Sequence, residues 1–374
     1  MNNDKELKVK TKLIINKFSQ LNKYDLTYIK VLIIKQIKIN DDKDILNKLI
    51  NLKKLIINDC IYLKEIPNII NLRYLKINNC ENIKEIPNNL INLEYLEIID
   101  NDNIKEIPNT LINLKKLIIF NCKNIKEIPN NLINLEYLVI VNNDNIKEIP
   151  NTLKKLIIFN CGNIKEIPNN LINLEDLEII NNDNIKEIPN NLINLKELKI
   201  DYCKNIKEIP NIINLRKINI NECNNRKEIP TTLINLKKIE IINCNNIKEI
   251  PDNLINIEEL NLNCCKIIIP NTFIKLKKLE LSNYNNIYDF NISISNTLFN
   301  LKYLKIFNCN ILIPNTYINL KSLYINLNNS IEYIPKELIN LKSLEIYDCY
   351  NLKNEFNTFI NLKNFNNYKV SISK

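Results

Sequence analysis

Hydrophobic and polar residues alternate in a segment that this chain repeats every 18 to 23 residues. Each copy contains Leu-x-x-Leu-x-Ile, in which the second leucine and the isoleucine stand two residues apart, as in Leu52-x-x-Leu55-x-Ile57. Side chains two residues apart lie on the same side of a β-strand. The pattern therefore predicts one short strand per copy, with one buried and one solvent-facing side.

A single copy cannot bury its own leucine and isoleucine side chains, so the repetition predicts a solenoid of stacked copies. Strands that lie about 4.8 Å apart would merge these side chains into one continuous core. We expect the repeats to span residues 29–360, with about fifteen full copies and a weaker first copy. Residues 1–28 and 361–374 lack the full repeat and are predicted to be the amino- and carboxy-terminal caps of that core.

Cysteine or asparagine stands three residues after the isoleucine in nearly every copy, and we call this set the ladder. The ladder consists of Asn101, Asn143, Asn182, Asn328, Cys60, Cys80, Cys122, Cys161, Cys203, Cys223, Cys244, Cys265, Cys309 and Cys349. We expect its amides to bond the backbone at the turn and its thiols to be small buried groups. Cys264, beside the ladder, should point away from the core and be the most reactive thiol.

Four successive ladder cysteines also suggest a zinc site, but their predicted spacing opposes it. In-line strands would spread Cys203, Cys223, Cys244 and Cys265 over roughly 14 Å. One zinc ion needs four ligands at about 2.3 Å from a single point. We therefore expect no metal site.

The repeated pattern Leu-x-x-Leu-x-Ile-x-x-Cys/Asn-x-x-Ile-x-x-Ile-Pro resembles the leucine-rich repeat, in a short form of about 21 residues. The resemblance implies a curved solenoid, nominally α/β but mostly β, with a parallel sheet on its concave side. Its convex side would be short 3-10 or extended segments. The repeats, rich in Asn, Ile and Lys, are also similar to those of giant amoeba-infecting DNA viruses.

The charge distribution and the absence of targeting signals indicate the cellular compartment that we expect for this protein. The net charge of +9 is concentrated in residues 1–50, which hold 11 lysines and 6 acidic residues. Elsewhere adjacent Lys-Glu pairs largely offset one another, which is typical of a solvated face. The start of the chain is charged without an apolar core, and no apolar run is long enough to span a membrane. Eleven cysteines without an export signal favour free thiols. We expect an intracellular, cytoplasmic protein that is not secreted and has no membrane partner.

The composition also argues against catalysis. The chain has no histidine, which excludes Ser-His and Cys-His pairs and histidine metal ligands. Its one glycine, Gly162, excludes a phosphate-binding loop and a dinucleotide fingerprint. The repeated glutamates stand in near-identical surroundings, whereas a general acid needs a distinctive one. We expect no enzyme activity, no cofactor and no small-molecule substrate.

Apolar residues occupy the predicted solvent-facing strand positions in five consecutive copies. Such a contiguous exposed stripe commonly marks an interaction site. The predicted partner-binding residues are Tyr95, Ile99, Ile118, Phe120, Tyr137, Val139, Val141, Ile157, Phe159 and Ile180. The alternative interpretation is that strand propensity, together with a codon bias toward isoleucine and phenylalanine, accounts for the stripe.

The sequence thus predicts a non-catalytic scaffold that binds a protein partner of unknown identity through its concave face. One alternative is a substrate-recruiting adaptor of the ubiquitin-ligase type, whose basic amino-terminal region docks a second component. Another is a weak electrostatic nucleic-acid binder, which the offset Lys-Glu pairs disfavour. Deletion of residues 1–28 tests the first alternative, and salt-sensitive retention on heparin tests the second.

Overall fold

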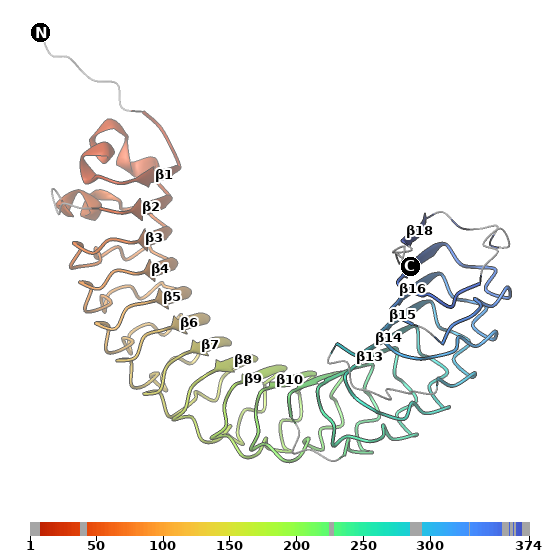
Figure 1. The fold of residues 1–374 in the computed structure, drawn as a ribbon. Helices are drawn as coiled ribbons and strands as arrows, with labels where there is room; N and C mark the ends of the chain where they lie inside the picture. The colour runs from red at the N-terminus through yellow and green to blue at the C-terminus, as the bar shows by residue number, and fades with distance from the viewer. Residues whose placement is uncertain are drawn as a thin grey trace, which may run out of the picture. The chain divides into compact units, whose positions relative to one another are not determined.

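The computed structural model describes residues 8–37, 43–223, 228–284, 294–328 and 330–353, residues 359 and 362, and residues 364–368. Of the predicted caps, residues 1–7, 361, 363 and 369–374 lie outside this set. The chain forms two compact units, Met1–Ile185 and Lys186–Lys374, which we describe separately. In each unit the strands follow one another in chain order along one side, and the connecting turns lie on the other (Figure 1).

The first unit contains nine strands in its described residues. They are β1 (Lys12–Ile15), β2 (Val31–Lys35), β3 (Lys54–Asn58), β4 (Tyr74–Asn78), β5 (Tyr95–Ile99), β6 (Lys116–Phe120), β7 (Tyr137–Val141), β8 (Lys155–Phe159) and β9 (Asp176–Ile180). Each strand pairs in parallel with the next, and equivalent residues of successive copies face each other, as Leu55 faces Leu75 and Ile57 faces Ile77.

The second unit also contains nine strands in its described residues. They are β10 (Glu197–Asp201), β11 (Lys217–Asn221), β12 (Lys238–Ile242), β13 (Glu259–Asn263), β14 (Lys278–Ser282), β15 (Tyr303–Phe307), β16 (Ser322–Asn326), β17 (Ser343–Tyr347) and β18 (Asn364–Tyr368). They pair in the same parallel, in-register manner.

The core consists of the residues that the repeat predicted. The second leucine and the isoleucine of each copy, represented by Leu96 and Ile98, are fully buried, and the residues between and beside them alternate toward solvent. Helix is confined to three 3-10 segments, η1 (Phe18–Lys23), η2 (Leu26–Tyr28) and η3 (Lys43–Lys48), within the described residues. The outer segments of the later repeats are turns and extended chain. The predicted leucine-rich-repeat solenoid, mostly β, is confirmed.

Most strands end in a sharp turn that uses the left-handed backbone region. Among the described residues, fifteen non-glycine residues have φ between 49° and 54°, and each stands directly after a strand. Asparagine and aspartate tolerate this region better than other residues with a Cβ atom, and they occupy ten of these positions. Leu327 also adopts it, with φ of 51°, although its side chain gives no such tolerance.

The ladder residues satisfy the backbone behind these turns, as predicted. The backbone N–H of Cys80 donates to Oδ1 of Asn101 at 3.0 Å, and the Asn101 amide donates to the Ile99 carbonyl at 2.6 Å. The Cys122 thiol donates to the Phe120 carbonyl at 3.2 Å. Burial raises the pKa of the Cys122 thiol to about 11. The ladder cysteines are therefore buried structural thiols.

The expectation for Cys264 was wrong, because this residue is only 1% exposed. It adopts the left-handed turn with φ of 53°, and its backbone N–H donates to the Ser282 carbonyl at 2.7 Å. Its thiol lies 3.1 Å from Oδ1 of Asn263. In the next copy Ser282 and Asn283 are also buried, at 5% and 3% exposure. The small thiol is covered by this close packing instead of projecting into solvent.

Candidate functional site

Three rows of solvent-facing side chains cross strands β5–β9 of the first unit, and they contain all ten predicted partner-binding residues. The first row is Tyr95, Lys116, Tyr137, Lys155 and Asp176; the central row is Glu97, Ile118, Val139, Ile157 and Glu178; the end row is Ile99, Phe120, Val141, Phe159 and Ile180. The strand register therefore brings the predicted residues onto one face of the sheet, where each lies beside its equivalents in adjacent copies.

The central row is aliphatic in the middle and charged at both ends. Ile118, Val139 and Ile157 are half-buried, and they follow one another between Glu97 and Glu178. Glu97 accepts hydrogen bonds from Lys76 Nζ at 2.9 Å and from the Tyr95 hydroxyl at 2.7 Å. Burial opposes ionisation of Glu97, but these two donors lower its pKa, so it is a carboxylate at neutral pH.

The first row alternates cations with aromatic rings. Lys116 Nζ lies 3.9 Å from the centre of the Tyr137 ring and 5.4 Å from that of Tyr95, and both contacts have cation–π geometry. Tyr95 also stacks on Tyr74, with ring centres 4.2 Å apart. Burial, together with the hydrogen bond to Glu97, raises the pKa of Tyr95, so its hydroxyl stays neutral. These contacts hold long side chains in fixed positions beside the aliphatic residues.

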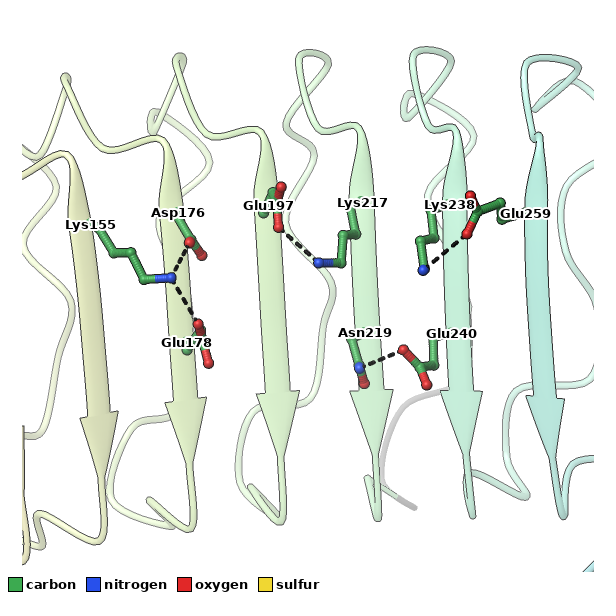
Figure 2. Close-up of polar contacts among 9 residues, drawn as sticks. All are labelled: Lys155, Asp176, Glu178, Glu197, Lys217, Asn219, Lys238, Glu240 and Glu259. Atoms are coloured by element: carbon green, nitrogen blue, oxygen red, sulfur yellow. Dashed lines mark hydrogen bonds and ion pairs between the residues drawn. The ribbon is translucent and has the colours of Figure 1, made fainter. Parts of the chain in front are cut away.

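The ion pairs at the β8–β9 end of the first row are drawn in Figure 2. Lys155 Nζ lies 2.5 Å from an oxygen of Asp176 and 3.1 Å from one of Glu178. Burial disfavours the charged amine, but the two carboxylates outweigh it and raise the pKa of Lys155. This end of the stripe therefore presents a fixed group of charges, in which two carboxylates share one lysine.

The end row is only partly the exposed surface that was predicted. Phe120 and Phe159 are 36% and 37% exposed, whereas Val141 between them is 7% exposed. The expectation that Val141 faces solvent was therefore wrong. Val141 lies in register between two larger aromatic residues, so a partner at this row would contact mainly the phenylalanines.

A polar groove of about 780 Å³ lies directly beyond the end row, at the carboxyl ends of the strands of the first unit. Its lining residues are Asn79, Glu81, Asp100, Asp102, Asn103, Asn121, Lys123, Asn142, Asp144 and Asn160. The amides are ordered, since Asn121 donates to Asp100 at 2.8 Å and Asn142 donates to Asn121 at 2.6 Å. Four carboxylates and one lysine make the groove acidic.

The sheet of the second unit presents ion pairs in place of an aliphatic stripe (Figure 2). Lys217 pairs with Glu197 at 2.9 Å, and Lys238 pairs with Glu259 at 3.0 Å. Further along, Tyr324 and Tyr347 lie with ring centres 5.5 Å apart. The aliphatic surface between charged ends is thus a feature of the first unit.

Three polar side chains on strands β10 and β11 have a buried oxygen that accepts no hydrogen bond from a described residue. Oδ1 of Asp201, Asn219 and Asn221 is buried without a hydrogen-bond partner. Burial raises the pKa of Asp201, although Lys199 Nζ lies 3.9 Å from its other oxygen. This carboxylate is therefore a local cost to stability at neutral pH.

Among the described residues, no group of three or more His, Cys, Asp or Glu side chains is arranged to hold a metal ion. No helix in these ranges is both long enough and apolar enough to cross a membrane.

Sequence reasoning identified the apolar members of the site but missed its charged members. Lys116 and Lys155 contact the tyrosines, and Glu97 and Glu178 bound the central row. A comparison of the same strand position in successive copies would have revealed them, because the register is regular. The acidic groove could not be found in this way, since it requires the turns to have known shapes.

Comparisons with known proteins agree with this architecture. Residues 46–159 match the family model of a leucine-rich repeat region. A leucine-rich-repeat protein of Leptospira interrogans has a similar structure, with 20% identity, coverage of 88% of this chain and 99% of that chain, and a TM-score of 0.59. The functional domain of InlJ from Listeria monocytogenes, which includes a cysteine ladder, has 18% identity, coverage of 84% and 72%, and a TM-score of 0.59.

A third similar structure is CroV588, a circular leucine-rich-repeat protein from a giant virus. It has 20% identity, coverage of 86% of this chain and 53% of that chain, and a TM-score of 0.52. The comparison with curated proteins found no match. At these identities the likeness shows the fold alone, so the resemblance to viral repeats stays a prediction.

Proposed function

We propose that this leucine-rich-repeat chain is a non-catalytic scaffold, and that a protein partner binds the solvent-facing side of strands β5–β9. One observation carries the proposal: Ile118, Val139 and Ile157 form an aliphatic centre between two ordered carboxylates, Glu97 and Glu178. An apolar centre within a polar rim is the usual composition of a protein-binding surface.

The shape of the surface favours a polypeptide over a small molecule. Five strands at about 4.8 Å spacing make the stripe roughly 19 Å long between its outer strands. The half-buried aliphatic residues lie on an open sheet, where an extended segment can cover several strands at once. Phe120 and Phe159 would contribute most of the newly buried apolar area, because each is more than one-third exposed.

The charged rim would give the interaction its specificity. Lys116 and Lys155 are held against tyrosine rings, and Glu97 is held by Lys76 and Tyr95. Because these groups are fixed before binding, a partner with matching charges loses little entropy on them. A partner with like charges would be rejected.

The test replaces the exposed aromatics with charges. A partner is first captured from native cells, identified by mass spectrometry and purified, so that affinity can be measured with two pure proteins. Phe120→Glu combined with Phe159→Glu should weaken binding by about 100-fold or more, since two buried anchors are lost and charges are desolvated. Circular dichroism should be unchanged, because both side chains are partly exposed.

A matched control carries the same charge change elsewhere. Ile133 and Ile172 are 66% and 54% exposed on turns of the same unit. Ile133→Glu with Ile172→Glu should therefore leave the affinity within about twofold of the parent value. If the two double variants bind the purified partner equally well, the stripe is not the site.

A further inference from the structure

The residue directly before each strand forms a row along the amino-terminal edge of the sheet, and in the second unit this row is strongly basic. We define the basic edge as Lys196, Arg216, Lys237, Lys277, Lys302, Lys321 and Lys342. Backbone hydrogen bonds join neighbouring members, for example from Lys321 N–H to the Lys302 carbonyl at 2.9 Å. The cations therefore stand on successive strands, with a single carboxylate, Glu258, among them.

The same position in the first unit shows that this accumulation of charge is not required by the repeat. There Lys30, Lys53 and Arg73 are all basic, but from Arg73 to Glu175 the row alternates in sign, and side chains of this stretch pair with one another. Glu94 pairs with Arg73 at 3.1 Å and with Lys115 at 2.9 Å. Glu136 pairs with Lys154 at 2.8 Å. The fold thus tolerates both patterns, and the like-charged pattern of the second unit carries a repulsion that folding does not need.

Four of the seven members of the basic edge are exposed without an ion pair to another described residue. Glu258 contacts Lys237 at 3.6 Å and also contacts Lys277. Arg216, Lys302, Lys321 and Lys342 are exposed, and their side chains take part in no ion pair within the part of the chain that the structure describes.

Part of the basic edge borders a groove of about 290 Å³. The lining residues are Lys196, Arg216 and Lys237, together with Asn194, Asn214 and Asn235. The amides of Asn214 and Asn235 donate to the carbonyls of Ile193 and Ile213, at 2.7 Å and 3.0 Å. These bonds tie the turns of successive copies together, so the cations stand beside an ordered surface.

A row of exposed apolar residues precedes the basic edge by three residues in each copy. Its members, 41% to 59% exposed, are Ile193, Ile213, Ile234, Ile255, Ile274, Phe299, Ile318 and Ile339. A single-stranded nucleic acid would favour aromatic side chains for stacking, and this row has one. A polypeptide that combines acidic and aliphatic side chains matches both the charge and the apolar row.

We propose that the basic edge of the second unit binds an acidic polypeptide segment that also carries aliphatic side chains. This surface is independent of strands β5–β9, so the chain would hold two partners or two parts of one partner. The carboxylates would pair with Arg216 and the lysines, and the aliphatic groups would cover the exposed isoleucines. The ionic contacts would weaken as the salt concentration rises, because the cations are exposed to solvent.

The experiment measures binding of a fluorescent peptide to the full-length protein by anisotropy. The eight strand positions from Lys196 to Lys342 cover roughly 34 Å, which an extended peptide of about 10 to 12 residues can span. The probe is a peptide of this length made of glutamate and leucine, and its control replaces glutamate with glutamine. We expect the glutamate peptide to bind at least about tenfold more tightly at low salt.

Matched variants locate the site. Arg216→Glu with Lys321→Glu should reduce affinity for the glutamate peptide by at least about tenfold. Lys207→Glu with Lys336→Glu makes the same change in net charge at exposed turn positions of the same unit and should change affinity by less than about twofold. If both double variants lost affinity for the glutamate peptide equally, net charge alone would explain the loss, and the proposal would be overturned.

Two other results would also overturn it. One is the absence of any preference for the glutamate peptide over the glutamine peptide. The other is tighter binding of an oligothymidylate of equal charge at the same salt concentration, with the same sensitivity to Arg216→Glu, because the edge would then be a nucleic-acid site.

Discussion

Asn143 offers the sharpest test of how the ladder stabilises the solenoid. Its side chain is fully buried and makes four hydrogen bonds to the backbone. The amide donates to the carbonyls of Cys122 at 2.5 Å and Ile125 at 3.3 Å. Its oxygen accepts from the backbone N–H groups of Asn145 at 3.0 Å and Ile146 at 3.1 Å. Replacement of Asn143 by alanine removes all four hydrogen bonds at once.

The expected loss follows from two buried groups that lose their bond to Asn143, the Ile146 N–H and the Cys122 carbonyl. Each buried polar group that loses its bond costs about 1–3 kcal/mol, so Asn143→Ala should lower the free energy of unfolding by about 2–6 kcal/mol. Asn143→Cys should cost roughly half as much, because a thiol is a weak donor and a weak acceptor. Cysteine already stands at the equivalent positions in the adjacent copies, Cys122 and Cys161.

Urea unfolding followed by circular dichroism gives the overall loss, and hydrogen exchange of residues 143–150 gives the local one. Local exchange is needed because repeat proteins can unfold copy by copy. Asn130→Ala, at an exposed turn position, is the control and should lie within about 0.5 kcal/mol of the parent. An alanine variant within about 1 kcal/mol of the parent, or a cysteine variant less stable than alanine, would refute the role assigned to the ladder.

Three further outcomes follow from the described geometry. Burial raises the pKa of Cys122 and Cys161 to about 11, above the ordinary 9.0. In the folded protein at pH 8, iodoacetamide should therefore alkylate these thiols about 100-fold more slowly than in the protein unfolded by urea. Equal rates in the two states would contradict their burial. Leu327→Asn should stabilise the protein by about 0.5–1 kcal/mol, measured as a higher urea midpoint, because asparagine tolerates the φ of 51°. Burial raises the pKa of Asp201 above 3.8, so its carboxylate destabilises the fold increasingly as pH rises through the interval between its unfolded and folded pKa values. Asp201→Asn should therefore be more stable than the parent at pH 7 and equal to it at pH 3, and a gain that persists at pH 3 would contradict this cause.

The scaffold, adaptor and nucleic-acid interpretations predict different behaviours. A scaffold loses its partner on Phe120→Glu with Phe159→Glu, whereas an adaptor loses a second component on deletion of residues 1–28. The adaptor and nucleic-acid interpretations stay predictions, and so do the cytoplasmic location and the absence of enzyme activity.

The sequence by itself determined the solenoid, because every copy carries the same two-residue alternation. Leu96 and Ile98 can be buried together only on one side of a strand, and a single copy offers nothing to cover them. The spacing also determined which side chains share the solvent-facing side. The spacing therefore places Ile118, Val139 and Ile157 in one row, as the strand register has them.

Tertiary structure decided how far each of those side chains is exposed. Val141 and Cys264 occupy positions that the repeat alone assigns to solvent, yet neighbouring copies cover both. Tertiary structure also decided which charges are paired. Glu94 and Glu136 pair with cations on adjacent strands, whereas like charges lie next to one another around Arg216. Both arrangements arise only because the strands lie side by side. Burial and electrostatic pairing depend on distances between copies, and a pattern along one chain does not contain those distances.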